Sequence, residues 1–200
     1  MKKLAVLLLI ITPTIILARI GENNFSMLIE GYGGIFKPPL SISSNFNKVY
    51  GKNNLIDGFG IGLGWKNAYL IFKQKDIELN GKSIVSGIDL EGKAYFKETF
   101  SILAARFYEG LLFTELGYVI NSIKEDILTN QPIYSKLNTI YSTSNNDGVS
   151  FCFGFYIPFK KIIIMSDINY IYVLSKSPNN SENKINIGGL MFNLSIGINL

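Results

Sequence analysis

The last twelve residues of the chain, GLMFNLSIGINL (189–200), alternate between two kinds of side chain. Large apolar residues occupy every second position, and mostly small or polar residues stand between them. Because successive side chains of a β-strand point to opposite faces, this pattern predicts a strand with one apolar and one mostly polar face. The predicted apolar face of this terminal strand consists of Leu190, Phe192, Leu194, Ile196, Ile198 and Leu200.

The same period of two recurs along the chain. In DGFGIGLGWKN (57–67) large apolar residues alternate with glycine, and in GVSFCFGFYIPF (148–159) they alternate with mostly smaller residues. Apolar spacing near 3.6 residues, which is typical of helices, is hard to find after the first eighteen residues. The sequence therefore predicts an all-β protein, with further strands at 25–36, 68–79, 101–109, 111–122 and 162–174.

The predicted connections are of two kinds, and they alternate along the chain. Short turns are expected at Lys66–Asn67, around Glu109–Gly110 and at 159–161. Long polar loops are expected at 37–55, 123–147 and 175–184. Alternating short turns and long loops are typical of outer-membrane barrels, which place the turns in the periplasm and the loops outside.

The direction of successive strands predicts an antiparallel up-and-down barrel of eight strands. Counting back from the terminus leaves one long hairpin over 68–108, with its tip near Asn80–Gly81 or Glu91–Gly92. The alternative is ten strands, with a turn at Lys97–Glu98 and an extra strand at 133–142. Lipid offers no partner for an unpaired backbone edge, so we expect the terminal strand to pair with the first strand.

Charged residues on the strands fall opposite the apolar face. The opposite face carries five of them from five predicted strands, and a soluble barrel and a membrane barrel would treat them in opposite ways. A soluble barrel would expose these charges to water, whereas a membrane barrel would enclose them in its lumen. The residues of this predicted lumen charge cluster are Glu30, Lys73, Arg106, Glu115 and Asp167. Arg106 and Glu115 lie on adjacent predicted strands and are expected to pair, and Lys73 is expected to pair with Glu30 or Asp167.

The volume available inside a small barrel favours the membrane assignment. An eight-stranded barrel has an interior just wide enough to be filled by side chains. A soluble barrel would have to enclose at least nine large aromatic residues, among them Phe59, Trp65 and Phe151. The membrane assignment instead places charged groups among the small inward residues Gly58, Gly60, Gly62, Gly64, Gly117, Gly154 and Gly197.

The beginning of the chain is predicted to be a secretory signal peptide. Residues 1–18, MKKLAVLLLIITPTIILA, combine a lysine pair, a short apolar run and Ala18 at the expected cleavage position. A retained N-terminal anchor is the alternative. Cleavage removes Lys2 and Lys3 but no acid, so the formal charge falls from +4 to +2. This charge and the absence of a basic aromatic stripe argue against nucleic acid as a partner.

Composition argues against catalysis. The chain has no histidine, which is the commonest general base and a common metal ligand, and it has one cysteine, Cys152. The glycines of GFGIGLG (58–64) keep a strand's period of two and do not open a helix onto phosphate. We therefore expect no enzyme activity, no cofactor, no metal and no internal disulfide.

The predicted barrel resembles the small outer-membrane β-barrel proteins of Gram-negative bacteria. This superfamily includes the OmpA transmembrane domain, OmpX and the Opa-type opacity proteins. The stretches that carry the resemblance are MKKLAVLLL (1–9), IEGYGGIFKP (29–38), ILAARFYEGLLFTELGYV (102–119) and GGLMFNLSIGINL (188–200). The resemblance covers nearly all of residues 19–200 as a pattern of alternation and spacing.

The resemblance implies a location, partners and a state of the lumen. It implies insertion in the lipid of the outer membrane by the barrel assembly machinery, which reads a final strand that usually ends in an aromatic residue. Here that residue is Leu200, a departure from the usual pattern. It also implies a lumen plugged by charged residues. Barrel enzymes of this membrane, such as lipid A palmitoyltransferases, lipid A deacylases and omptin-type proteases, rely on histidine, which this chain lacks.

Three functions remain open at this point. We expect a non-catalytic outer-membrane barrel with a structural or surface-adhesion role, with any surface partner bound through loops 37–55, 123–147 and 175–184. The first alternative is a narrow, porin-like channel for ions or solutes. The second is a soluble periplasmic barrel that carries an apolar ligand.

Overall fold

A computed structural model describes residues 25–39, 46–52, 54–85, 88–129, 145–177 and 180–200. Residues 1–18, where the signal peptide is expected, lie outside these ranges, as does the extra strand at 133–142 of the ten-strand alternative. Among the described residues, no helix is long and apolar enough to cross a membrane.

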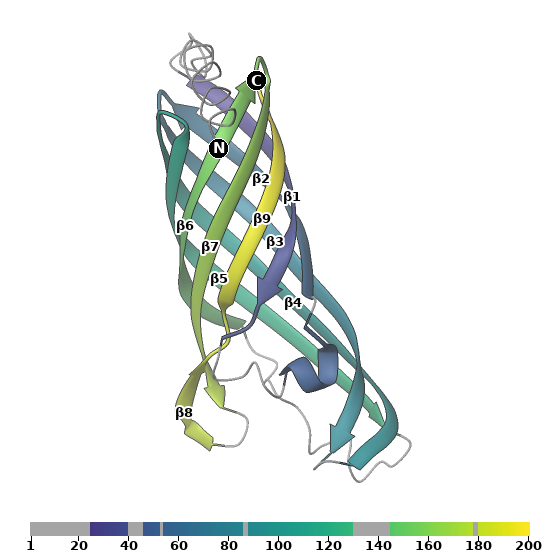
Figure 1. The fold of residues 1–200 in the computed structure, drawn as a ribbon. Helices are drawn as coiled ribbons and strands as arrows, with labels where there is room; N and C mark the ends of the chain where they lie inside the picture. The colour runs from purple at the N-terminus through teal and green to yellow at the C-terminus, as the bar shows by residue number, and fades with distance from the viewer. Residues whose placement is uncertain (1–24, 40–45, 53, 86–87, 130–144, 178–179) are drawn as a thin grey trace, which may run out of the picture.

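Nearly all of the described chain is β-strand (Figure 1). All pairings are antiparallel, and a short helix at 46–50 lies beside the strands. The strands are β1 Phe25–Lys37, β2 Asn54–Trp65, β3 Ala68–Val85, β4 Ile88–Glu109, β5 Leu112–Thr129, β6 Asn145–Phe159, β7 Ile162–Ser177, β8 Asn180–Asn186 and β9 Gly189–Asn199.

Eight of these strands close into a barrel, which confirms the predicted fold and strand number. The order around the barrel is β1, β2, β3, β4, β5, β6, β7 and β9, because β9 pairs with both β1 and β7. The terminal strand thus closes the barrel against the first strand, as expected, and Met27 and Leu200 exchange two backbone hydrogen bonds of 3.0 and 2.8 Å. Strand β8 lies outside the closed ring, and among the described strands its partner is β7.

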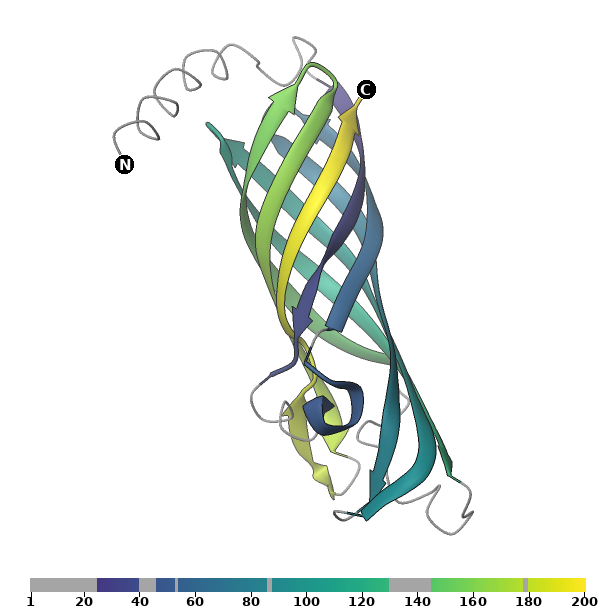
Figure 2. The same cartoon turned by 45° about the vertical axis from the view of Figure 1, so that its right-hand side comes forward.

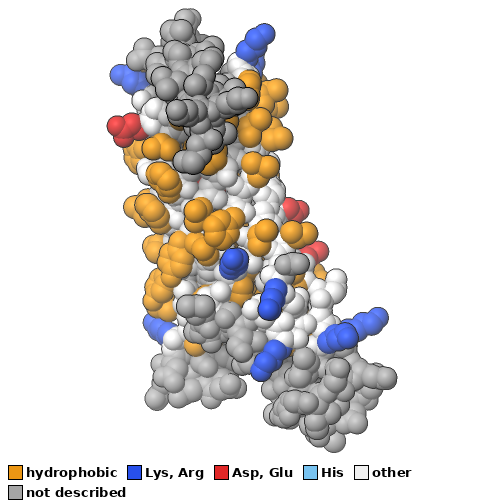
Figure 3. All heavy atoms as spheres, viewed as in Figure 1, with side chains coloured by type: hydrophobic (Ala, Val, Ile, Leu, Met, Phe, Trp, Pro, Cys, Tyr) orange, Lys and Arg blue, Asp and Glu red, His pale blue; other side chains and the backbone are white. Residues whose placement is uncertain are grey.

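Large apolar side chains cover the outside of the barrel, and charged ones lie inside it. On β9, Leu194 and Ile196 are each 60% exposed, whereas the alternating residues Asn193 and Ser195 are buried. Figure 3 shows apolar side chains spread over the middle and upper part of the visible face. The soluble alternative, with these residues packed inside, is therefore wrong, because the outward side of each strand is the apolar one.

The two ends of the barrel differ. At one end, here called the turn end, two-residue turns join β2 to β3, β4 to β5 and β6 to β7. At the opposite end, here called the loop end, β3, β4 and β5 continue well past their neighbours as a three-stranded sheet (Figure 2). We call this sheet, formed by 76–85, 88–99 and 122–129, the outer extension.

The outer extension corrects several boundaries expected from the sequence. The hairpin reverses between Val85 and Ile88, which pair with each other, so both predicted tips lie inside strands. Loop 123–147 begins inside β5 and ends inside β6, and most of 175–184 belongs to β7 and β8. Loop 37–55 overlaps both β1 and β2. The strands run further than expected because the alternation of inward and outward side chains continues beyond the apolar band. There the outward side chains are polar, so the segments resemble loops in sequence.

Candidate functional site: the filled lumen

A wall of glycine makes room for large side chains in the lumen. Gly60, Gly62 and Gly64 of β2 face inward. A Cβ atom on Gly60 would lie 2.9 Å from the Glu30 carboxylate, and one on Gly64 would lie 2.4 Å from the Tyr69 ring. The glycines predicted to face inward therefore provide the space in which the lumen charges and rings pack.

Arg106 on β4 is the centre of the buried charge network. Its two terminal nitrogens donate to the two Glu30 oxygens at 2.9 Å each, and its Nε donates to Glu115. Glu30 also accepts a hydrogen bond from Tyr32. The paired carboxylates compensate the charge of a guanidinium that is entirely removed from solvent.

Lys73 on β3 extends this network through the second oxygen of Glu115. The Arg106–Glu115 pair expected from the sequence is present, since the two residues face each other across β4 and β5. Lys73 pairs with Glu115 and not, as expected, with Glu30 or Asp167. The structure thus brings four of the five predicted cluster residues together.

Asp167, the fifth predicted residue, lies apart from these ion pairs. One of its oxygens accepts a hydrogen bond of 2.6 Å from Asn193, and the other has no partner among the described residues. Fully buried Lys75 also has no hydrogen-bond partner there, and its Nζ lies 4.9 Å from the centre of the Tyr32 ring. Buried polar atoms of this kind are usually satisfied by ordered water, so we expect water between the charge network and the β7–β9 wall.

An aromatic cluster fills the lumen at the turn end. Tyr108 packs edge to face against Tyr69 and Tyr156, with ring centres 5.4 and 4.7 Å away. Tyr156 donates a hydrogen bond of 2.8 Å to the Gly110 carbonyl in the β4–β5 turn. Tyr108 also accepts one of 2.8 Å from Arg106, so the ring cluster is joined directly to the charge network.

An apolar core fills the loop end, and the short helix at 46–50 covers it. Phe46 packs edge to face on Phe96 of β4, with ring centres 5.2 Å apart. Tyr50 packs on both rings and donates a hydrogen bond of 2.5 Å to Glu125 of β5. Burial and the adjacent Glu125 carboxylate raise the pKa of Tyr50 above its usual value. The helix is therefore attached to the outer extension by both apolar and polar contacts.

Glu98 is, like Glu125, a buried carboxyl of the outer extension. Asn121 donates a hydrogen bond of 2.7 Å to it, and no described cation pairs with it. Outward residues at this level, such as Asp76 and Lys97, are charged, which places Glu98 beyond the apolar band. Burial raises the pKa of Glu98 well above its ordinary range, although the Asn121 hydrogen bond opposes this shift.

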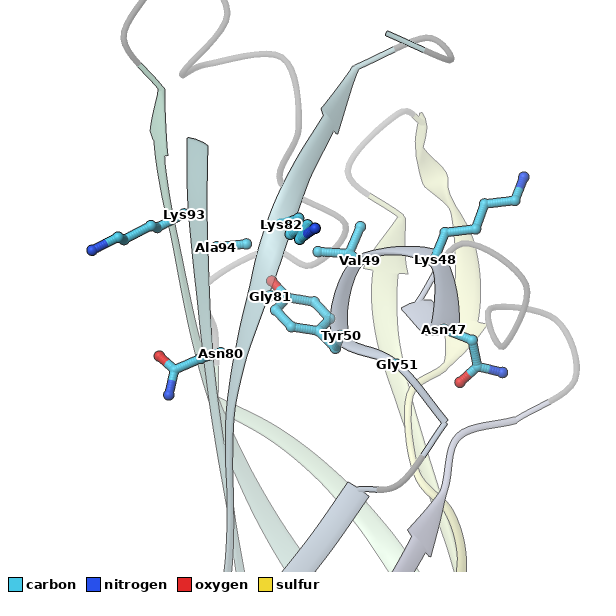
Figure 4. A pocket seen from close by; sticks show the side chains of 10 residues that line it. All are labelled: Asn47, Lys48, Val49, Tyr50, Gly51, Asn80, Gly81, Lys82, Lys93 and Ala94. Atoms are coloured by element: carbon cyan, nitrogen blue, oxygen red, sulfur yellow. The ribbon is translucent and has the colours of Figure 1, made fainter. Parts of the chain in front are cut away.

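A hollow of about 600 Å³ opens beside the helix, between residues 47–51 and the adjoining parts of β3 and β4. Figure 4 shows Tyr50 and Val49 near its centre, whereas Lys48 and Lys93 point away to opposite sides. The lysines therefore do not converge on one point inside the hollow.

Sequence reasoning missed three features of the lumen. Lys75 follows Lys73 at the strand period of two and could have been found by that spacing. Tyr32 likewise lies two residues after Glu30 and so faces the same side of its strand. The packing of Phe46 and Tyr50 on β4 has no such signal, because they belong to a segment that was expected to be a loop.

These features define a class of fold: a closed, eight-stranded antiparallel barrel with an apolar exterior, a charged interior and one extended end. Among solved structures, the chain is similar to Ail, the attachment invasion locus protein of Yersinia pestis, with 12% identity and a TM-score of 0.53. The similarity covers 88% of this chain and 98% of Ail. That likeness supports the fold.

Two further barrels resemble the chain more distantly. The N-terminal barrel domain of Pseudomonas aeruginosa OprF is 14% identical, with a TM-score of 0.43 over 88% of this chain and 97% of that domain. Neisserial surface protein A is 10% identical, with a TM-score of 0.44 over 89% of this chain and 98% of the other. No family model matches the sequence, and no curated protein matches it.

Proposed function

We propose that the protein is an integral outer-membrane barrel with a closed lumen and a structural and surface-contact role. The observation that carries this proposal is the filling of the lumen at three successive levels. Aromatic rings occupy the turn end, the Arg106 network lies next to them, and the apolar core under the helix occupies the loop end. This filling at three levels supports a closed lumen, and we expect no open pathway for ions.

The apolar band supports a location in a membrane. Lipid-exposed charges are costly in a transmembrane barrel, by about 2 to 4 kcal/mol for lysine or arginine at mid-membrane. The predicted lumen charge cluster lies inside the barrel, and the large apolar side chains of the band face outward and are exposed. With the fold shared with Ail, this favours the outer membrane, reached through the signal peptide at 1–18 and the barrel assembly machinery.

A non-catalytic role fits the chemistry of the lumen. The buried carboxylates Glu30 and Glu115 are committed to Arg106 and Lys73, so neither is free to act as a base. The thiol of Cys152 is fully buried. We propose that these residues stabilise the barrel and that the protein needs no cofactor.

Gel mobility and conductance together test this proposal. Unboiled protein in mild SDS should migrate differently from boiled protein, because a closed barrel resists SDS. Reconstituted protein should give no steady current in planar bilayers. A steady current that changes in Arg106→Met or Glu115→Gln would instead support the narrow channel. Absence of a mobility shift, with the protein in the soluble fraction, would contradict the membrane barrel itself.

The surface role is assigned to the outer extension. Its outward face is polar, with Glu78 bound by Lys97 and Tyr95 at 2.8 and 3.1 Å. Lys82 and Lys93 pair directly across β3 and β4, and both are exposed. Like charges at opposite positions destabilise a sheet, and an anionic partner would relieve their repulsion.

An anionic polysaccharide is the first partner to test at this surface. Ail was crystallised with a heparin analogue, sucrose octasulfate. We expect the barrel to be retained on immobilised heparin and to elute at lower salt when Lys82 and Lys93 are both changed to Gln. Lys124→Gln, on the neighbouring strand, is the matched control. Equal elution of all three proteins would contradict this assignment of the contact.

A further inference from the structure

Basic residues occupy two of the three turns at the turn end. Lys66 lies in the β2–β3 turn, and Lys160 and Lys161 form the β6–β7 turn. All three side chains are exposed, and no described carboxylate forms an ion pair with any of them. The third turn, between β4 and β5, begins after Glu109 and contains Gly110. The two basic turns therefore present unpaired positive charge.

The closed topology places the two basic turns on opposite sides of the barrel. Around the ring, the junction of β2 and β3 is separated from that of β6 and β7 by four strands in either direction. The β4–β5 turn lies halfway between them on one side. Positive charge at two opposite points can contact a planar surface that surrounds the barrel, whereas a single compact ligand could not reach both.

The backbone of these turns gives an independent reason to assign them a role. The first residue of all three has a positive φ: 54° at Lys66, 56° at Lys160 and 61° at Gly110. This conformation is easily adopted by glycine and is unfavourable for other residues. Two lysines thus occupy positions where glycine would be the less strained residue. Strain of this kind is a reason to look for a function of the side chain.

Each basic turn follows an exposed aromatic residue. Trp65 precedes Lys66 and is 62% exposed, and Phe159 precedes Lys160 and is 57% exposed. Both rings face outward at the end of the apolar band. Aromatic rings at the edge of the apolar band of a barrel lie at the level of the lipid headgroups, where the apolar interior of the membrane meets water. A lysine in the next position then lies at the depth of the headgroup phosphates.

We propose that Lys66, together with Lys160 and Lys161, forms two opposed binding sites for anionic phospholipid headgroups at the periplasmic face of the membrane. Each site combines an outward aromatic ring, which contacts the acyl–headgroup boundary, with one or two ammonium groups that bind phosphate. Two sites on opposite sides would fix the depth and tilt of the barrel. This inference rests on the proposed membrane insertion and adds a lipid preference to it.

Trp65 is the single tryptophan of the chain and lies beside Lys66, so its fluorescence reports the lipids at that site. The protein is reconstituted in phosphatidylcholine vesicles that contain brominated phosphatidylglycerol or brominated phosphatidylcholine, and Trp65 quenching gives the relative affinity of the two lipids. We expect about a threefold to fivefold preference for phosphatidylglycerol that decreases with added salt.

Four variants test whether the preference arises at the turns. Lys66→Gln should abolish it at Trp65, and Lys66→Gly should do the same with a less strained backbone. Lys97→Gln, at the far end of the barrel, should leave it unchanged. The opposite site is read in a Trp65→Phe, Phe159→Trp background, where changing both Lys160 and Lys161 to Gln should abolish the preference.

The outcomes separate this inference from the proposed function. Equal quenching by both lipids, or a preference that survives Lys66→Gln and Lys66→Gly, would overturn the inference and leave the membrane barrel intact. Absence of quenching by either brominated lipid would show that Trp65 does not contact lipid and would contradict the membrane barrel.

Discussion

Strand β3 passes through two regions that arrange polar and apolar side chains in opposite ways. In the barrel, Leu70 and Phe72 face outward, and Lys73 faces inward. In the outer extension, Glu78 faces outward, and Ile77 faces inward. The outward faces of β4 and β5 also change from apolar to polar at this level. The pairing of β3 with β4 keeps its register from Ala68 to Lys82, across the level at which the polarity changes. The change therefore concerns the surroundings of the sheet and not the sheet itself.

The comparison shows where the surrounding solvent changes. The outward face, which is apolar beside lipid, becomes polar beside water. On the opposite face, Ile77 and Phe96 pack in one apolar cluster with Phe46 and Tyr50 of the helix. Among the side chains that the structure describes, the last large exposed apolar residues before the extension are Phe72, Leu103 and Ile120. On this basis the edge of the membrane crosses β3, β4 and β5 just beyond these residues.

The largest expected effect is the loss of stability when a buried ion pair of the barrel is broken, compared with the loss when the exposed Lys97–Glu78 pair of the extension is broken. Arg106→Met leaves the Glu30 carboxylate buried without its partner, so unfolding should become easier by about 3 to 5 kcal/mol. Adding Glu30→Gln should restore most of this, because Lys73 still pairs with Glu115. Lys97→Met breaks the exposed Glu78 pair and should change stability far less, because solvent screens this pair. Urea unfolding from vesicles measures all three.

The next largest effect compares two positions on β5, one that faces lipid and one that faces water. Leu116 of β5 is 66% exposed in the apolar band, and Leu116→Arg should reduce the free energy of unfolding by about 2 to 4 kcal/mol. Ser122→Arg, on the same outward side in the extension, should change it by about 0.5 kcal/mol or less. Equal effects in urea titrations would contradict the proposed membrane edge.

A smaller effect is the pH dependence of stability, which has opposite signs for two carboxyl groups of the extension, Glu98 and Glu78. Because burial raises the pKa of Glu98, folding favours the protonated acid, and stability falls as pH rises from the unfolded pKa through the folded one. Glu98→Gln should therefore stabilise the protein by about 1 to 3 kcal/mol at pH 8 and by much less at pH 4. Unfolding at the two pH values measures the difference.

Glu78 provides the matched comparison for Glu98. Hydrogen bonds from Lys97 and Tyr95 lower the pKa of this exposed carboxyl, so its contribution is present above the unfolded pKa and is lost as pH falls through the folded one. Glu78→Gln should thus be slightly destabilising at pH 8 and neutral at low pH. A change of the same sign for both variants would contradict the assigned surroundings of Glu98.

The smallest effect lies at the end of the barrel opposite the extension. Gly110→Ala places a Cβ atom on a residue with a φ of 61° and should lower stability by about 1 kcal/mol. Lys160→Gly makes the converse change in the equivalent turn and should not destabilise it in the same way. Thermal unfolding in detergent micelles compares the two variants, and a loss of similar size in both would contradict the inferred backbone strain.

Much of the barrel could be predicted from the sequence because alternation is a local property. The face on which Leu194 or Glu115 lies follows from its position in a run with period two, and the glycines of β2 identify a wall that leaves space. The same reasoning underestimated the lengths of β3 and β4. Outside the membrane the outward face of a strand is polar, so an apolar face no longer identifies the side that faces lipid.

The sequence by itself determined the two faces of the barrel strands, the class of barrel and five of the charged residues that face the lumen. Only the tertiary structure decided that Arg106 binds Glu30, that Lys73 binds Glu115 and that the helix at 46–50 covers the loop end. The physical reason is that each strand sets its own faces through its backbone geometry. Contacts between strands far apart in sequence depend instead on the register of every pairing and on closure of the ring.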